Sequence, residues 1–136
     1  MPDHDDASPH EIIESVFNAI DAGSIEDAVE FFSSDITIHF ANIGPLTGPA
    51  AFVDLYNQLA DMVQGVRHEI HNIWSVVESP DAAVSQATAH YTLVNGHHIS
   101  LPCCNIFRLS GSLISEYRVF MDVTPALSAA TATSSM

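Results

Sequence analysis

The stretch Ser100–Pro125, SLPCCNIFRLSGSLISEYRVFMDVTP, decides the fold of this chain. It contains two runs, LPCCNIFRL and LISEYRVFMDV, that are rich in the β-branched and aromatic residues typical of strands. Ser110-Gly111-Ser112 lies between the two runs and predicts a tight turn. The stretch is therefore expected to form two long strands joined as a β-hairpin.

Alternation along these strands predicts which side chains share a face. One face carries a thiol, an amide and a phenol among apolar neighbours, which is the mixture expected in a small-molecule pocket. The predicted binding residues on this face are Cys103, Asn105, Phe107, Tyr117 and Met121.

The rest of the chain predicts three helices followed by antiparallel strands. Ser8-Pro9-His10-Glu11 combines an N-cap serine, a proline at the first helical position and a glutamate at the third. Asn95-Gly96 is a strong signal for a two-residue hairpin turn. The predicted elements are helices over 9–22, 24–32 and 49–63 and strands over 36–43, 67–77, 83–94, 97–109 and 113–123.

This order, α-α-β-α-β-β-β-β, predicts one α+β domain over residues 9–125. A strongly bent antiparallel sheet wrapped around the helices would enclose a cone with one open mouth. Residues 1–8 are expected to be a disordered acidic leader, and residues 126–136 a flexible tail.

The charge is strongly negative, with 17 acidic residues against three arginines and no lysine, which gives a net charge of −14. Such a surface repels phosphate backbones and anionic lipids, so nucleic-acid and membrane binding are not expected. The chain has no run of eighteen apolar residues and no basic-then-apolar leader. The composition therefore predicts a cytoplasmic protein.

No metal or cofactor is expected. The adjacent Cys103 and Cys104 point to opposite faces of a strand and are interpreted as small buried hydrophobes. His68 and His71 also point to opposite faces, and the His97-His98 pair lies at a hairpin turn, so neither pair suits zinc. Glycine-rich phosphate loops and Gly-x-Ser-x-Gly are absent from the sequence.

Two segments carry a family resemblance. Asp21-Ala22-Gly23 through Phe32, and Phe107-Arg108 through Tyr117, make residues 10–125 similar to the NTF2-like superfamily, and to its SnoaL-like proteins in particular. This superfamily includes ketosteroid isomerases, polyketide cyclases, limonene-epoxide hydrolases, scytalone dehydratase and nuclear transport factor 2. The resemblance implies the cone-shaped NTF2-like (cystatin-like) fold, a small apolar ligand and a homodimer.

Two of the catalytic sets known among these relatives are not retained. In the ketosteroid isomerase pattern the tyrosine position is Val16, the base position is Phe40 and the oxyanion position is Asn105, which alone keeps a hydrogen-bonding group. In the limonene-epoxide hydrolase pattern one relay position falls near Thr88, and only Asn42 matches the water-orienting asparagine. The resemblance therefore implies binding roles, rather than these two mechanisms, for Val16, Phe40, Asn42 and Thr88.

His90 and Asp122 are the candidates for the acid–base pair that SnoaL-like relatives use. Alignment through the following turn places Thr88 and His90 on the cavity side, whereas the apolar alternation of Ala89 and Tyr91 predicts the reverse. The alignment and the apolar alternation are both satisfied if the outer face of the sheet is buried in a dimer. His90 at the outer surface, and Asp122 as a cap of the next turn, are the alternatives.

The sequence thus predicts a cofactor-free isomerase, cyclase or lyase that acts on an apolar molecule with a carbonyl or hydroxyl group. The alternative is a non-catalytic ligand-binding or dimeric interaction module on the same fold. A cone filled by Phe40, Phe52, Phe107 and Met121, with His90 outside, would favour this alternative. Tyr56 and Trp74 are interpreted as packing residues.

Overall fold

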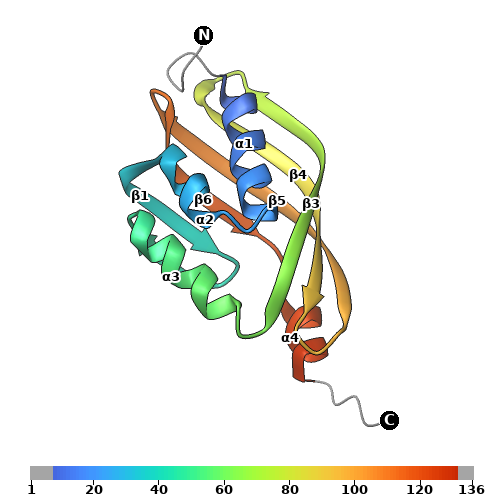
Figure 1. The fold of residues 1–136 in the computed structure, drawn as a ribbon. Helices are drawn as coiled ribbons and strands as arrows, with labels where there is room; N and C mark the ends of the chain where they lie inside the picture. Colours follow the sequence, from blue (N-terminus) through green and yellow to red (C-terminus); the bar gives the residue numbers. More distant parts are fainter. Residues whose placement is uncertain (1–7, 132–136) are drawn as a thin grey trace.

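The structure, a computed structural model, describes residues 8–131 and has an α+β architecture (Figure 1). Its helical elements are α1 (Pro9–Asp21), α2 (Ile25–Ala28), the 3-10 turn η2 (Val29–Phe31), α3 (Pro49–Leu59) and α4 (Thr124–Thr131). Its strands are β1 (Phe32–Phe40), β2 (Ile43–Thr47), β3 (Val63–Val76), β4 (Ser79–Leu93), β5 (His98–Ser110) and β6 (Leu113–Phe120). They form one open sheet in the order β2-β1-β6-β5-β4-β3.

The sheet is mixed, which corrects the prediction of an antiparallel sheet. Neighbouring strands run antiparallel except for β1 and β6, which are parallel, with Ile38 beside Tyr117 and Phe40 beside Val119. The two strands lie far apart in the chain, so no turn signal announces their pairing. The parallel contact brings the first strand against the closing hairpin.

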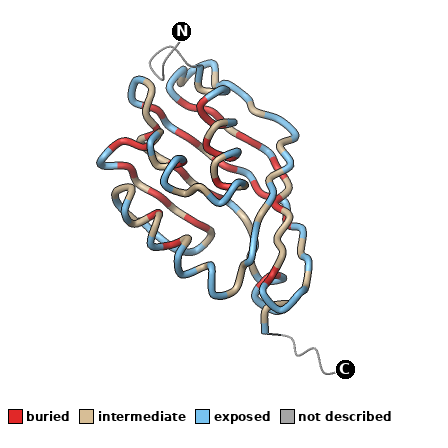
Figure 2. The backbone as a smooth tube through the Cα atoms, in the orientation of Figure 1, coloured by how far each residue is buried: buried red, intermediate tan, exposed pale blue. Residues whose placement is uncertain are grey.

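Helices α1, α2 and α3 lie over the same face of the curved sheet (Figure 1). α1 packs on β3 and β4, and α3 packs on β1 and β2. Buried positions concentrate where these helices cover the strands (Figure 2). The sheet and the three helices therefore enclose one core, and the cavities described below lie within or beside it.

Helix α1 begins as the sequence predicts. The hydroxyl of Ser8 accepts the backbone N–H of Glu11 at 3.2 Å, and the Glu11 carboxylate accepts the backbone N–H of Ser8 at 3.0 Å. This capping box satisfies two backbone donors that have no partner inside the helix. One face of the helix is buried, with an apolar stripe made by Ile12, Ile13, Val16, Phe17 and Ile20.

A hairpin turn is present at both predicted places, but the first is longer than the two residues expected, since residues 94–97 separate β4 from β5 and the backbone N–H of Leu93 donates to the carbonyl of His97 at 2.9 Å. Gly96 follows β4 with φ +92°, and Gly111 joins β5 to β6 with φ +64°. Backbone in this region favours glycine because a side chain would clash with the preceding carbonyl. The second hairpin places Asn105 of β5 and Tyr117 of β6 on the same buried face of the sheet.

Two elements differ from the sequence prediction. β2 is an additional strand after β1, and Thr124–Thr131 forms helix α4 where a flexible tail was expected. The Asp122 carboxylate accepts the backbone N–H of Thr124 at 3.0 Å, and Asn95 donates to the carbonyl of Ala129 at 2.8 Å, so the helix is held at both ends. The predicted leader, apart from Ser8, and residues 132–136 lie outside the described residues.

Among residues 8–131, no helix is both long enough and apolar enough to cross a membrane.

Candidate functional site

A small cavity lies between the inner face of the sheet and α3. Its volume is about 10 Å³, roughly the space that one water molecule needs. It therefore has room for a single oxygen-sized group, and its wall is unusually rich in hydrogen-bonding groups. The residues that line it are Phe40, Tyr56, His68, Ala89, Tyr91, Cys103, Asn105, Tyr117, Val119 and Met121.

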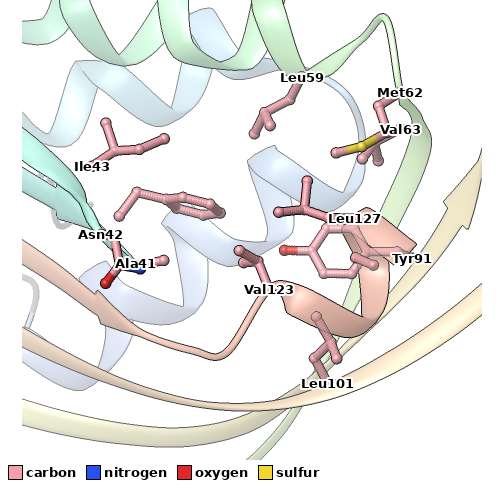
Figure 3. Close-up of a pocket in the computed structure, with 12 residues that line it drawn as sticks. Ala41, Asn42, Ile43, Leu59, Met62, Val63, Tyr91, Leu101, Val123 and Leu127 are labelled. Atoms are coloured by element: carbon pink, nitrogen blue, oxygen red, sulfur yellow. The ribbon is translucent and has the colours of Figure 1, made fainter. Parts of the chain in front are cut away.

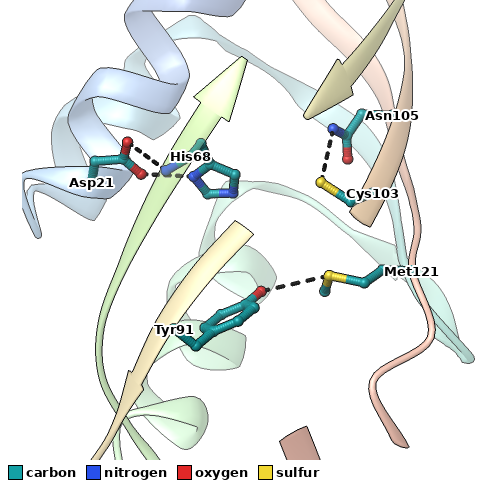
Figure 4. Close-up of polar contacts among 6 residues, drawn as sticks. All are labelled: Asp21, His68, Tyr91, Cys103, Asn105 and Met121. Carbon is teal, nitrogen blue, oxygen red and sulfur yellow. Dashed lines mark hydrogen bonds and ion pairs between the residues drawn. The ribbon is translucent and has the colours of Figure 1, made fainter. Parts of the chain in front are cut away.

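The polar wall centres on a histidine–carboxylate pair that joins α1 to β3. Nδ1 of His68 lies 2.6 Å from Oδ1 of Asp21, and the backbone N–H of His68 donates to Oδ2 at 2.9 Å (Figure 4). These two contacts fix both the ring and the strand against the carboxylate. Nδ1 is thereby occupied, which leaves Nε2 as the ring nitrogen available to the cavity.

Local sequence places both residues. Asp21 is the last residue of α1, which ends because Gly23 takes φ +78°. His68 shares the inward face of β3 with Val66 and Ile70. The centroids of the Phe17 and His68 rings lie 4.6 Å apart. Within residues 8–131, Nε2 of His68 forms no hydrogen bond, so this nitrogen is open to a ligand at the cavity.

Three tyrosines, which are all the tyrosines of the chain, line the same cavity. Burial raises the pKa of Tyr56, Tyr91 and Tyr117 above the usual range of a phenol, so all three remain protonated donors. The Tyr91 hydroxyl donates to the sulfur of Met121 at 3.9 Å. The hydroxyls of Tyr56 and Tyr117 have no partner in the part of the chain that the structure describes.

Asn105 is fully buried beside these tyrosines. Its side-chain N–H group donates to Oγ of Ser85 at 3.0 Å and to Sγ of Cys103 at 3.8 Å (Figure 4 shows the second contact). Its amide oxygen is therefore the atom left for a ligand, whereas the oxyanion position that the resemblance gives to Asn105 needs a donor. Burial raises the pKa of the Cys103 thiol, so it is a neutral wall group rather than a nucleophile.

A larger apolar cavity of about 270 Å³ adjoins the small one at Phe40 and Tyr91 (Figure 3). We call it the apolar mouth. Its wall comes from the β1–β2 turn, the end of α3, the start of β3 and helix α4. The residues that line it are Phe40, Ala41, Asn42, Ile43, Leu59, Met62, Val63, Tyr91, Leu101, Val123, Ala126 and Leu127.

The structure places His90 and Thr88 on the outer face of the sheet, away from both cavities, which corrects the alignment that put them inside. Nε2 of His90 contacts Glu69 at 2.9 Å and Nδ1 contacts Ser100 at 2.7 Å, while Thr88 contacts His71 at 2.8 Å. Their neighbours Ala87, Ala89 and Tyr91 face the core, as the apolar alternation predicted. A ligand inside the cone does not reach His90.

The other predicted residues divide into three groups. Cys103, Asn105, Tyr117, Met121 and Phe40 line the small cavity, and Asn42 lines the apolar mouth. Val16 and Phe107 are fully buried core residues that line neither cavity. Asp122 is exposed and begins α4 through its contact with Thr124, which holds the pKa of its carboxyl below the usual range.

The sequence prediction missed Asp21, His68, Tyr56 and Tyr91 as site residues. Alternation of Val66, His68 and Ile70 was the available signal for His68, because it places the ring on the buried face of its strand. Asp21 had no comparable signal, since it lies 47 residues from His68 in the chain. Trp74, interpreted as a packing residue, is 48% exposed on the outer face of β3.

A family model for the SnoaL-like domain matches residues 13–117 of this chain. The chain belongs to the SnoaL-like domain family. The curated proteins include no match to it. The SnoaL-like assignment agrees with the resemblance noted in the two sequence segments. The matched range contains the residues that line the two cavities except those that follow residue 117.

Solved structures show the same fold at low sequence identity. An NTF2-like protein of unknown function from Burkholderia pseudomallei shares 12% identity with a TM-score of 0.82, over 96% of this chain and 100% of that one. A protein with a ketosteroid isomerase-like fold from Catenulispora acidiphila, in complex with trimethylamine, shares 16% with a TM-score of 0.79, over 93% and 96%. An LEH-like epoxide hydrolase from M. tuberculosis shares 16% with a TM-score of 0.71, over 86% and 84%. The SnoaL-like domain therefore has the predicted cone-shaped NTF2-like fold.

Proposed function

We propose that this SnoaL-like domain binds a small apolar molecule with one oxygen group and performs cofactor-free acid–base chemistry on it, as an isomerase, cyclase or lyase. The observation that carries the proposal is the Asp21–His68 pair beside two unpartnered tyrosine hydroxyls. The apolar mouth accommodates the body of the ligand, and the small cavity accommodates its oxygen.

In the proposed step, Nε2 of His68 takes a proton from a carbon next to a carbonyl group. The C–H electron pair forms a carbon–carbon double bond while the carbonyl electrons move to oxygen. Tyr56 and Tyr117 donate hydrogen bonds to this developing oxyanion. The Asp21 carboxylate accepts the hydrogen bond from Nδ1–H of His68 and stabilises the imidazolium. Return of the proton from His68 to a different carbon completes an isomerisation. In a cyclisation the enolate attacks a second carbonyl, and the new alkoxide oxygen takes the proton back from His68.

The experiment uses 2-tetralone, an apolar bicyclic ketone with exchangeable protons next to its carbonyl. We expect the protein to accelerate exchange of these protons in heavy water, followed by NMR. His68→Gln should slow the catalysed exchange by about 10²–10⁴-fold, the usual contribution of a general base. His90→Gln is the matched control, since this histidine also contacts a carboxylate but lies outside the cone. Equal loss in both variants, or loss in His90→Gln alone, contradicts the assignment to His68.

One observation favours the non-catalytic alternative. The small cavity has only about 10 Å³ of space, and Phe52 and Phe107 fill the adjacent core. Phe40 and Met121 line the cavity, and His90 lies outside. Binding of 2-tetralone by the wild-type protein without accelerated exchange would identify a ligand-binding module.

We also propose a cytoplasmic homodimer formed through the outer face of β3–β6. Trp74 and Phe120 expose 48% and 52% of their surface there, beside the half-buried Ile106. Exposed aromatic residues on a sheet face are typical of an interface. Sedimentation should give a dimer for the wild type and a monomer for Trp74→Glu. A wild-type monomer contradicts the proposed homodimer.

The two free thiols and the acidic composition support the proposed cytoplasmic location.

A further inference from the structure

A third cavity, of about 260 Å³, opens between the carboxyl ends of α1 and α3 and the start of β3. We call it the polar opening. It shares Leu59, Val63 and Tyr91 with the apolar mouth, so these three side chains separate the two. The residues that line it are Ile20, Asp21, Gly23, Ile25, Tyr56, Asn57, Leu59, Ala60, Val63, Gln64, Gly65, Val66 and Tyr91.

The two openings differ in chemistry. The polar opening presents the carboxylate of Asp21 and the amides of Asn57 and Gln64. The wall of the apolar mouth contains only Asn42 and the phenol of Tyr91 as polar side chains. Water is therefore stabilised in the first cavity and is readily displaced by an apolar ligand from the second.

Asp21 lies between the polar opening and the small cavity. Its side chain is 23% exposed, whereas that of His68, its partner at 2.6 Å, is only 8% exposed. Asp21 lines the polar opening and His68 lines the small cavity. The hydrogen bond between them thus connects a solvent-accessible carboxylate to the buried acid–base group.

We infer that the polar opening is the route by which the Asp21–His68 pair exchanges protons with water while a ligand fills the apolar mouth. This inference rests on the proposed function of the pair. While His68 holds a proton on both ring nitrogens, its Nδ1 proton moves to the Asp21 carboxylate, which releases it to water in the polar opening. A proton from this water returns to Nδ1 by the reverse transfer, so one proton leaves, one enters and the imidazolium is restored. The proton on Nε2 then returns to the ligand, as in the proposed function.

The test follows exchange of the Nδ1 proton of His68 with water by NMR of the full chain with isotope-labelled histidine, at saturating 2-tetralone. Ala60→Trp covers the polar opening from the exposed end of α3, and Gln64→Trp covers it from β3. Leu127→Trp is the matched control, since it places the same side chain at the rim of the apolar mouth from α4.

We expect Ala60→Trp to slow the proton exchange severalfold without weakening 2-tetralone binding. Leu127→Trp should weaken 2-tetralone binding and leave the exchange rate unchanged. Gln64→Trp repeats the first test should Ala60→Trp fail to fold. The inference is overturned by folded variants of the polar opening that exchange at the wild-type rate, or by exchange that only Leu127→Trp slows.

Failure of the proposed function gives a different result. A protein that does not bind 2-tetralone, or whose His68→Gln variant retains catalysed exchange of the ketone protons, contradicts the proposed chemistry. The Nδ1 exchange rate in the ligand-free protein still compares Ala60→Trp with the wild type, and it decides whether the polar opening serves the pair.

Discussion

Asp21 and His68 should have a coupling free energy of about 1.5–3 kcal/mol, the range for hydrogen bonds to a charged group. Three features support this magnitude. The His68 side chain is only 8% exposed, the Nδ1–Oδ1 distance is 2.6 Å, and the same carboxylate accepts the His68 backbone N–H at 2.9 Å. Loss of the Asp21 carboxylate leaves the His68 ring largely shielded from water and without its partner.

A double-mutant cycle measures this coupling, with Asp21→Asn, His68→Gln and the double variant. Each single change should lower the free energy of unfolding by about 1–3 kcal/mol, because a partly buried polar group loses its partner. For a domain of this length each kcal/mol lowers Tm by about 3–5 °C. The double variant should lose less free energy of unfolding than the two single variants lose in sum, because both changes remove the same contact. Urea unfolding followed by circular dichroism gives all four free energies.

The chain contains its own control pair. Glu69 and His90 are also a carboxylate and a histidine, with 2.9 Å between Oε1 and Nε2, but they lie on the outer face with 51% and 29% of their side chains exposed. Exposed pairs of this kind contribute little because water screens them. The Glu69→Gln and His90→Gln cycle should therefore show no resolvable coupling. Equal coupling in the two cycles would refute the argument that burial distinguishes the Asp21–His68 pair.

Three further predictions follow from the described contacts. The free energy of unfolding should fall as the pH rises above about 10, the pKa of a tyrosine in an unfolded chain. Burial raises the pKa of Tyr56, Tyr91 and Tyr117, so only the unfolded chain ionises readily. Near-ultraviolet tyrosinate absorbance should appear only with the unfolding seen by circular dichroism, and ionisation within the folded protein would contradict this. Ser8→Ala should cost about 1 kcal/mol in urea unfolding through loss of the capping box, and an unchanged midpoint would show that the box is not formed. Phe107→Ala should lower the free energy of unfolding by about 3–5 kcal/mol, because the ring is fully buried and its centroid lies 4.6 Å from that of the stacked Tyr117 ring. A loss below about 1 kcal/mol by the same assay would contradict this packing.

Local signals in the sequence predicted much of the fold. The capping box at Ser8 and the glycine turns at Gly96 and Gly111 depend on neighbouring residues alone, and all three are present. The parallel contact between β1 and β6 was not predicted, because it joins segments that no turn connects. α4 was missed because its sequence, TPALSAAT, is small and weakly patterned.

The candidate site was predicted only where strand alternation decides the face. Asn105 and Tyr117 lie at the small cavity, as the period of two indicates. At His90 the alternation and the family alignment disagreed, and the structure follows the alternation, with Ala89 inside. The Asp21–His68 pair joins the end of a helix to a strand across the core, so its existence depends on tertiary packing that no local pattern encodes.

The sheet also separates the chromophores of this protein. All three tyrosines line the small cavity, while Trp74, the single tryptophan, lies on the opposite face. Tyrosine absorbance should therefore respond to a ligand in the cone, and tryptophan emission to a second molecule docking on the sheet. Unlabelled protein thus reports occupancy and self-association through two different residue types, and both can be titrated in the same cuvette.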